Sequence, residues 1–187
     1  MRYFFALWLA VLLVPPALAE PGYRAVEALM EAPTSLNGRF EQSKYLAALE
    51  TDIGSSGRFS YQQDIEINWH TLAPIENLLR LTPDQITSEQ DGALLTRLET
   101  RSNPVVALFS EIFFGVMTAR WDRLDEHFRA ETHVNGSDWQ AILVPREVRV
   151  QRVVSRVELQ GDHYLRQVVL YEEGGDWTRI RFYDLQQ

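Results

Sequence analysis

The four histidines are the residues best suited to metal binding or acid–base chemistry, but their positions favour neither. His70, His127, His133 and His163 are scattered along the chain, and no two of them lie four residues apart. A pair at that spacing, as in the H-E-x-x-H motif, places two imidazoles on one helix face where both reach a single metal ion. The sequence therefore predicts no metal site and no metal cofactor.

Nucleophiles and paired carboxylates give no better candidate for catalysis. No G-x-S-x-G motif occurs, and Ser55 and Ser56 lie in the segment "IGSSG", whose composition is typical of a turn. Glu172 and Glu173 are adjacent, so on a strand they would point to opposite faces. Three further acids, which we expect on the solvated face of a helix, are Asp122, Asp125 and Glu126. We therefore expect no enzyme, no catalytic residue and no cofactor.

Apolar side chains form the other candidate site. In "GRFSYQQDIEINWH" (57–70) large apolar residues recur at every second position, which places them on one face of a strand pair. After Asn103 and Pro104, a good N-cap and first helical residue, a wide apolar stripe follows at helical spacing. It comprises Val105, Leu108, Phe109, Ile112, Phe113 and Val116. These two apolar surfaces could pack into a core or enclose a pocket, and composition leaves both interpretations open.

The elements that would position these residues follow from periodicity and turn signals. We expect a short helix over 23–30, two hydrophobic helices between 103 and 128, and about ten strands. The expected strands are Arg39–Leu49, Gly57–Tyr61, Glu66–Thr71, Asn77–Leu81, Gln85–Ser88, Leu94–Leu98, Trp139–Val144, Val153–Leu159, Tyr164–Tyr171 and Trp177–Tyr183. Their short connections favour antiparallel neighbours, and a sheet of this size curls. The predicted fold is α+β, a curved antiparallel sheet forming an incomplete β-barrel (half-barrel) closed by a helical lid.

The N-terminus predicts export. Arg2, an apolar run over 4–14 and the small-residue site "ALA" (17–19) have the order of a cleavable signal peptide. We expect residues 1–19 to be removed and residues 20–187 to form one domain. The formal net charge of −8 includes Arg2, so its loss gives −9, and an acidic chain does not favour nucleic acid as a partner. The absence of cysteine agrees with the periplasm of a Gram-negative bacterium.

Several of these motifs, taken in order, resemble one family. The series Phe40-x-Gln42, Gly57-x-Phe59, Asn68-Trp69-His70, Pro74 and "TPDQI" is similar to the N-terminal half of LolA, the periplasmic carrier of outer-membrane lipoproteins. The segment "DWQAILVPR" resembles a strand of that family with the pattern Trp-x-x-x-x-x-Pro, and "GGDWTRIRFYD" resembles its late strand.

This resemblance implies a carrier with an apolar cavity for acyl chains and no hydrolytic activity of its own. The cavity is expected to include Phe40, Phe59, Tyr61, Ile67, Trp69, Leu79, Leu108, Phe109, Ile112 and Phe113. The implied partners are an acylated cargo (lipoprotein or lipid), an inner-membrane exporter or extractor, and an outer-membrane acceptor, with the carrier itself a monomer. The alternatives are an envelope sensor or regulatory lipid-binding domain with the same half-barrel fold and, third, a periplasmic hydrolase.

Two departures from the family favour a divergent paralogue. The family carries Arg-Pro before the tryptophan, and that arginine holds the lid through backbone carbonyls; Gln63 and Asp64 stand at these positions here. We expect Gln63 to act as a weaker lid latch, because an amide lacks the charge that strengthens hydrogen bonds. The sequence also ends at Gln187, where the family has a further strand.

Overall fold

The computed structural model describes residues 23–99, 112, 114–117 and 120–187. The signal peptide predicted for residues 1–19 lies outside these. The described strands are β1 (Ser35–Leu46), β2 (Thr51–Gln62), β3 (Glu66–Ala73), β4 (Asn77–Leu81), β5 (Gln85–Gln90), β6 (Ala93–Glu99), β7 (Phe128–Asn135), β8 (Asp138–Pro145), β9 (Val154–Gly161), β10 (Leu165–Glu172) and β11 (Trp177–Gln186). The described helices are α1 (Tyr23–Glu27), α3 (Trp121–His127), α4 (Val148–Gln151) and the 3₁₀ turn η1 (Ala47–Leu49).

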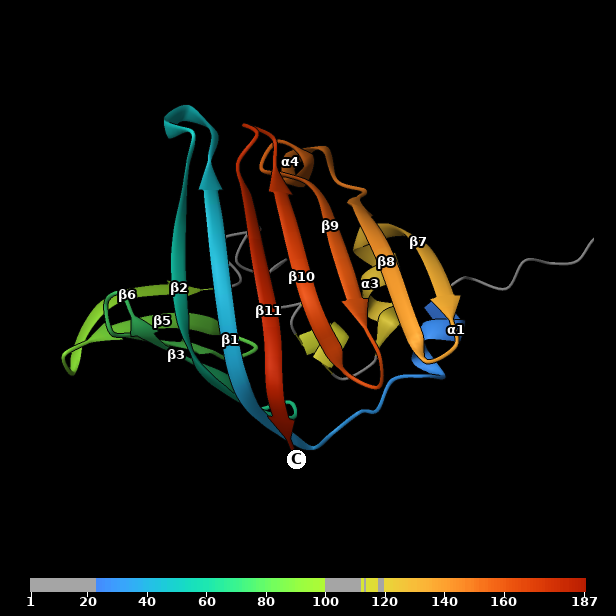
Figure 1. Ribbon diagram of the computed structural model, residues 1–187, viewed down its shortest axis with the longest axis horizontal. Helices are drawn as coiled ribbons and strands as arrows, with labels where there is room; N and C mark the ends of the chain where they lie inside the picture. The colour runs from blue at the N-terminus through green and yellow to red at the C-terminus, as the bar shows by residue number, and fades with distance from the viewer. Residues whose placement is uncertain (1–22, 100–111, 113, 118–119) are drawn as a thin grey trace, which may run out of the picture.

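All the described strands belong to one antiparallel sheet in the order β6-β5-β4-β3-β2-β1-β11-β10-β9-β8-β7. Each half is a meander, in which strands that follow one another in the chain pair side by side. The two halves are joined where β1 pairs with β11. Figure 1 shows that the sheet bends strongly, with β3, β5 and β6 turned away from the long central strands, and that it does not close into a barrel. The predicted half-barrel is confirmed.

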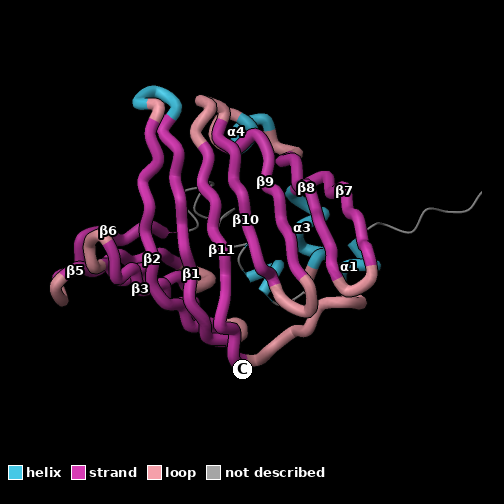
Figure 2. Tube along the Cα trace, viewed as in Figure 1, coloured by secondary structure: helices cyan, strands magenta, loops and turns pink. Residues whose placement is uncertain are grey.

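Strands β6 and β7 form the opposite edges of the sheet, and of the chain between them the structure describes residues 112, 114–117 and 120–127. Ile112, Val116 and Met117 lie in this connection and are buried in the main core cluster. Helix α3 follows them and lies behind β8 and β9 in the view of Figure 1. The described part of the predicted lid is therefore helical and packs against the sheet, as Figure 2 also shows.

Side-chain alternation explains which face of the sheet is buried. Along β8, Trp139, Ala141 and Leu143 are buried while the residues between them are exposed or half-buried. The Trp139 ring meets Trp121 of α3 edge-on at 5.4 Å between centroids, and its indole N–H donates to the Asp162 carbonyl at 2.7 Å. The helical layer is thus fixed to the C-terminal half of the sheet by apolar packing with one satisfied polar group.

Two expectations about the elements are wrong. The segment "IGSSG" is not a turn: Ser55 and Ser56 lie inside β2, paired with Gln42 and Glu41 of β1. The hairpin instead turns at η1, where Glu50 adopts the left-handed conformation at φ 47°. Local turn composition was outweighed by an uninterrupted ladder of cross-strand pairs.

The second wrong expectation concerns strand β7, which was not predicted: Phe128 was expected in a helix but begins this strand. Its period-two pattern is weak in sequence, because two of the inward residues between Phe128 and Val134 are the small Ala130 and the polar Thr132. As an edge strand it pairs only with β8 among the described strands.

Gly57 offers a direct test of how closely β2 and β3 approach. The register shifts between Ser56 and Gly57, and a Cβ on Gly57 would collide with the His70 carbonyl and press on the Phe40 ring. Overpacking of this kind costs about 1–3 kcal/mol, so Gly57→Ala is expected to lower the free energy of unfolding by that amount in urea titrations. Gly54→Ala on the same strand is the control, because its Cβ would meet only the Gln42 carbonyl at 4.0 Å. Equal stabilities of the two variants would contradict this packing.

Candidate functional site

The concave side of the sheet holds a cavity of about 460 Å³. This size is within the range of small-molecule sites, and its lining is mostly aliphatic, as such sites require. Its described lining residues come from seven strands, the lid segment and the β8–β9 connection. They are Gln42, Lys44, Ile67, Trp69, Leu79, Leu81, Ile86, Ile112, Val153, Val154, Val157, Val168, Leu170, Glu172, Thr178 and Ile180.

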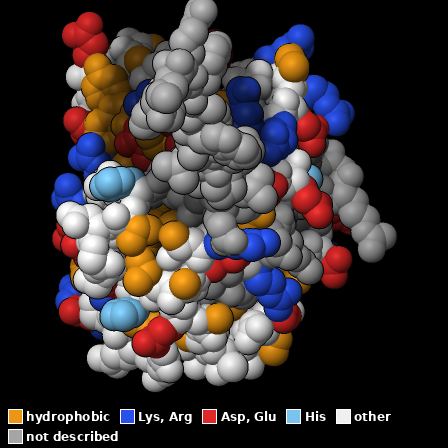
Figure 3. Space-filling view, turned by 90° about the vertical axis from the view of Figure 1, so that its right-hand side faces the viewer, with side chains coloured by type: hydrophobic (Ala, Val, Ile, Leu, Met, Phe, Trp, Pro, Cys, Tyr) orange, Lys and Arg blue, Asp and Glu red, His pale blue; other side chains and the backbone are white. Residues whose placement is uncertain are grey.

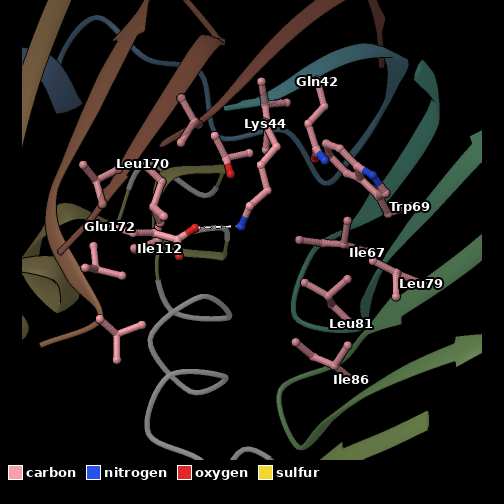
Figure 4. A pocket seen from close by; sticks show the side chains of 16 residues that line it. Gln42, Lys44, Ile67, Trp69, Leu79, Leu81, Ile86, Ile112, Leu170 and Glu172 are labelled. Carbon is pink, nitrogen blue, oxygen red and sulfur yellow. Dashed lines mark hydrogen bonds and ion pairs between the residues drawn. The ribbon is translucent and has the colours of Figure 1, made fainter. Parts of the chain in front are cut away.

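One wall of the cavity belongs to the N-terminal half of the sheet. Trp69 pairs directly with Leu79, and Ile67 with Leu81, so all four side chains share one face of β3 and β4. Ile86 extends this face onto β5 through its pairing with Leu81. Figure 4 shows these labelled side chains on one side of the cavity.

The opposite wall belongs to the C-terminal half of the sheet. Val168 and Ile180 are cross-strand partners on β10 and β11, and Val157 of β9 pairs with Leu170. Ile112 from the lid segment faces the same space (Figure 4). The cavity thus lies between the two halves of the sheet, and neither half encloses it alone.

An aromatic cluster ends the cavity near the middle of the sheet. The Phe40 ring stacks on Trp69 at 3.8 Å between centroids, while Phe59 and Phe182 lie 6.3 and 5.9 Å from it. Phe40 and Phe59 are buried beneath the cavity and do not line it. They hold Trp69 in place, because a stacked ring has little freedom to rotate.

The predicted cavity residues fall into three groups. Four of them line the cavity: Ile67, Trp69, Leu79 and Ile112. Three belong to the same core cluster but lie beneath the cavity surface: Phe40, Phe59 and Tyr61. The remaining three lie outside the described residues: Leu108, Phe109 and Phe113. Their contribution to a cavity stays a prediction.

Four polar residues of the lining were not anticipated. Gln42, Lys44, Glu172 and Thr178 all face the cavity, and the Lys44 ammonium donates to Glu172 Oε1 at 2.8 Å. The alternation that placed Phe40 inward continues to Gln42 and Lys44, so this signal was present in the sequence. On β10 the same alternation continues from Val168 and Leu170 to Glu172, but the pairing of Glu172 with Lys44 could not have been predicted, because the two residues lie 128 positions apart in the chain.

The predicted latch lies in the turn between β2 and β3. Gln63 is half-buried there, and its backbone N–H donates to the Thr34 carbonyl at 2.9 Å. Its neighbour Asp64 makes the ion pair to the lid region: both Asp64 oxygens accept from Arg120 Nη2, at 2.9 and 3.2 Å. The role of Gln63 as a latch stays a prediction. The observed ion pair from this turn has its arginine on the lid side.

A second contact ties the same point of the lid to α1. The Trp121 N–H donates to Glu27 Oε1 at 3.0 Å, one residue beyond the ion pair of Arg120. The start of α3 is therefore held from two sides, by the β2–β3 turn and by α1.

The polar groups elsewhere form pairs and small networks, such as that of Glu31, Tyr164 and Gln187. Among the residues that the structure describes, no group of three histidines or acids could hold a metal ion. His70 pairs with Glu76 at 2.8 Å, and His163 Nδ1 lies 3.2 Å from the Leu29 carbonyl. On the face shown in Figure 3, acidic and basic side chains are interspersed around small hydrophobic groups. Within the described part of the chain, no helix has the length and apolar character to span a membrane.

The chain matches no protein-family model and no curated protein sequence. Among solved structures, it is similar to a LolA superfamily protein from Nitrosomonas europaea at 8% identity and a TM-score of 0.48, covering 88% of this chain and 90% of that one. A DUF1329 family protein from Desulfovibrio piger has 9% identity and a TM-score of 0.48, covering 88% and 91%. A putative outer membrane lipoprotein-sorting protein domain from Vibrio parahaemolyticus has 12% identity and a TM-score of 0.43, covering 88% and 90%.

The Asp64–Arg120 pair is expected to restrain the lid more than it stabilises the fold. Its side chains are 61% and 36% exposed, so the pair contributes about 0.2–1 kcal/mol. Asp64→Asn should therefore change global stability little but speed amide hydrogen exchange over 112–127. Asp138→Asn, an exposed acid on β8, is the matched control. If Asp64→Asn and Arg120→Gln act additively in a double-mutant cycle, the two side chains are not coupled.

Tyr61 next to this pair predicts a pH dependence. Burial raises the pKa of Tyr61 to about 12, and the Asp64 carboxylate adds to the increase. An unfolded tyrosine titrates near 10, so the neutral phenol stabilises the fold below about pH 10, and this contribution disappears as the pH rises towards 12. Tyr61→Phe should leave the free energy of unfolding at pH 7 unchanged. Between pH 7 and pH 11 this free energy should fall less in the variant than in the unaltered protein, by on the order of 1 kcal/mol. Parallel urea-unfolding results for both proteins at pH 7 and 11 would contradict this.

Proposed function

We propose that this protein is a periplasmic carrier that binds the acyl chains of a lipoprotein or lipid-like cargo in the cavity and carries it between membranes. The observation that carries the proposal is the cavity of about 460 Å³ between the two halves of the sheet, with its aliphatic walls. Such a surface is unfavourable in water unless an apolar ligand or the lid covers it.

The free energy available from this cavity suits a carrier. Burying one methylene gives about 0.8 kcal/mol, so a twelve-carbon chain gives roughly 10 kcal/mol before the costs of ordering are subtracted. A carrier also has to release its cargo, so part of this gain must be spent on opening and closing a cover. The weak contacts at Arg120 and Trp121 hold the start of α3 with little free energy, which suits a lid that opens.

The proposed route runs from an inner-membrane exporter or extractor to an outer-membrane acceptor. The signal peptide predicted for residues 1–19 supports export, and the resemblance of the sequence to LolA supports this direction of transport. We expect the protein to take up cargo without hydrolysing it. Among the described residues, the cavity lining holds one Lys–Glu pair and no serine, cysteine or histidine.

Chain length is the decisive variable in a binding experiment. A hydrophobic fluorophore bound by the protein should be displaced by fatty acids with affinities that rise about fourfold per methylene and then level off when the cavity is full. Affinity independent of chain length would contradict the proposal.

Substitutions of lining residues test where a bound acyl chain lies in the cavity. Ile86→Trp should fill part of the cavity, so the affinity should level off at shorter fatty acids. Ile86→Asp should lower the affinity for fatty acids of every length. Leu94→Asp is the matched control, because Leu94 lies on the neighbouring strand, is 52% exposed and does not line the cavity. Transfer of an acylated fluorescent peptide between two vesicle populations should accelerate with added protein, and with the Ile86→Asp variant much less.

A further inference from the structure

The polar residues of the cavity gather at one end of it. Gln42 and Lys44 come from the end of β1 near η1, Thr178 from the start of β11 and Glu172 from the end of β10. Figure 4 shows the Lys44 and Glu172 side chains extending towards each other, with Leu81 and Ile86 at a distance from them. The cavity is therefore amphipathic, with one polar end and one long apolar part.

The register of three strands builds this polarity. Phe40 pairs with Phe182, Gln42 with Ile180 and Lys44 with Thr178, while on β10 Val168 and Leu170 pair with Ile180 and Thr178. Along each strand the inward residues change from apolar to polar in the same direction. The inward series are Phe40, Gln42 and Lys44 on β1, Phe182, Ile180 and Thr178 on β11, and Val168, Leu170 and Glu172 on β10. Three strands with the same gradient define where the polar part of a ligand belongs.

The Lys44–Glu172 pair is suited to exchange its partners. The two side chains are 37% and 29% exposed, so water reaches both, and such a pair contributes about 0–1 kcal/mol. Apart from Gln42 and Thr178 the lining is mostly aliphatic, so a charge that loses its partner there is only partly hydrated, which is unfavourable. A ligand can replace the pair at little cost only if it supplies a partner to each member.

This condition distinguishes the possible head groups. A single anion bound to Lys44 would leave Glu172 without its cation and add a second negative charge beside it, in a chain whose formal charge is already −8. A single cation would leave Lys44 without its anion. A head group that carries both signs pairs with both residues at once.

We propose that the polar end of the cavity binds a zwitterionic head group, with its anionic part on Lys44 and its cationic part on Glu172, while the chain extends towards Ile67, Leu81 and Ile86. This inference rests on the proposed function, because it assigns the head-group class of the same acyl-binding cavity.

Four amphiphiles with one twelve-carbon chain separate the head-group classes. Dodecylphosphocholine, dodecanoate, dodecylammonium and dodecyl maltoside are titrated below their micelle concentrations by calorimetry, with circular dichroism to verify the fold. We expect dodecylphosphocholine to bind about fivefold to tenfold more tightly than the other three, as a coupling on the order of 1 kcal/mol implies.

Charge variants locate the preference. Lys44→Met and Glu172→Gln should each remove the preference, so that each variant binds dodecylphosphocholine and dodecyl maltoside with equal affinity. The double variant Lys44→Glu with Glu172→Lys keeps the pair with its charges exchanged, so it should keep the preference. Arg166→Met is the matched control, since it removes a comparable ion pair with Asp162 (2.9 Å) that does not line the cavity.

The outcomes separate this inference from the proposed function. Equal affinity for all four head groups, with affinity still rising with acyl-chain length, would contradict the zwitterion site but remain consistent with the acyl-binding cavity. Tightest binding of dodecanoate, lost in Lys44→Met, would also overturn it, in favour of an anion site. If no amphiphile binds with chain-length dependence, the proposed function itself fails.

Discussion

The pairing of β1 with β11 connects two halves of the molecule that otherwise share few contacts within the sheet. It extends from Asn37 opposite Gln186 to Tyr45 opposite Trp177, so the first and last strands of the chain become neighbours at the centre. Each half is a meander that could pair internally without the other. The cavity cannot form in that way, because its walls belong to different halves. The cavity is thus a property of the whole fold, and folding has to bring together segments at the two ends of the chain before it exists.

The distribution of side-chain size explains why this space is not filled. Large rings concentrate near the middle of the sheet, where Phe40, Phe59 and Phe182 surround Trp69. The C-terminal wall instead carries short valines at 154, 157 and 168, which do not extend far into the cavity. A well-packed core interdigitates large and small side chains from facing surfaces. Here the large ones are stacked on each other and the small ones face the cavity, so the sheet's curvature leaves a volume between them.

Sequence periodicity predicted the class of fold, because alternating apolar residues specify which face of each strand is buried. For the same reason it predicted that Ile67 and Trp69 share one face of a strand. It did not predict the hairpin of β1 and β2, where "IGSSG" has turn composition but is held as strand by its neighbours. Nor did it predict the facing wall of β9 to β11, because the pairing of β1 with β11 is a long-range contact that no local pattern encodes. Lys44 and Glu172 were missed because a charged residue on a strand resembles a surface residue until its partner strand is known.

Two of the ion pairs that bridge parts of the molecule distant in sequence lie at the cavity and the lid: Lys44 with Glu172 within the cavity and Asp64 with Arg120 at the lid. Both are partly exposed, so both are screened by salt and contribute little to stability. A buried pair would hold these positions more firmly, but breaking it would cost several kcal/mol and oppose release. The apolar lining supplies a free energy that increases with every methylene of the ligand, whereas the ion pairs supply small terms that water and salt can reduce. In the proposed carrier, strong binding in the aliphatic part and weak closure at its polar borders would allow one cavity both to retain an acyl chain and to release it.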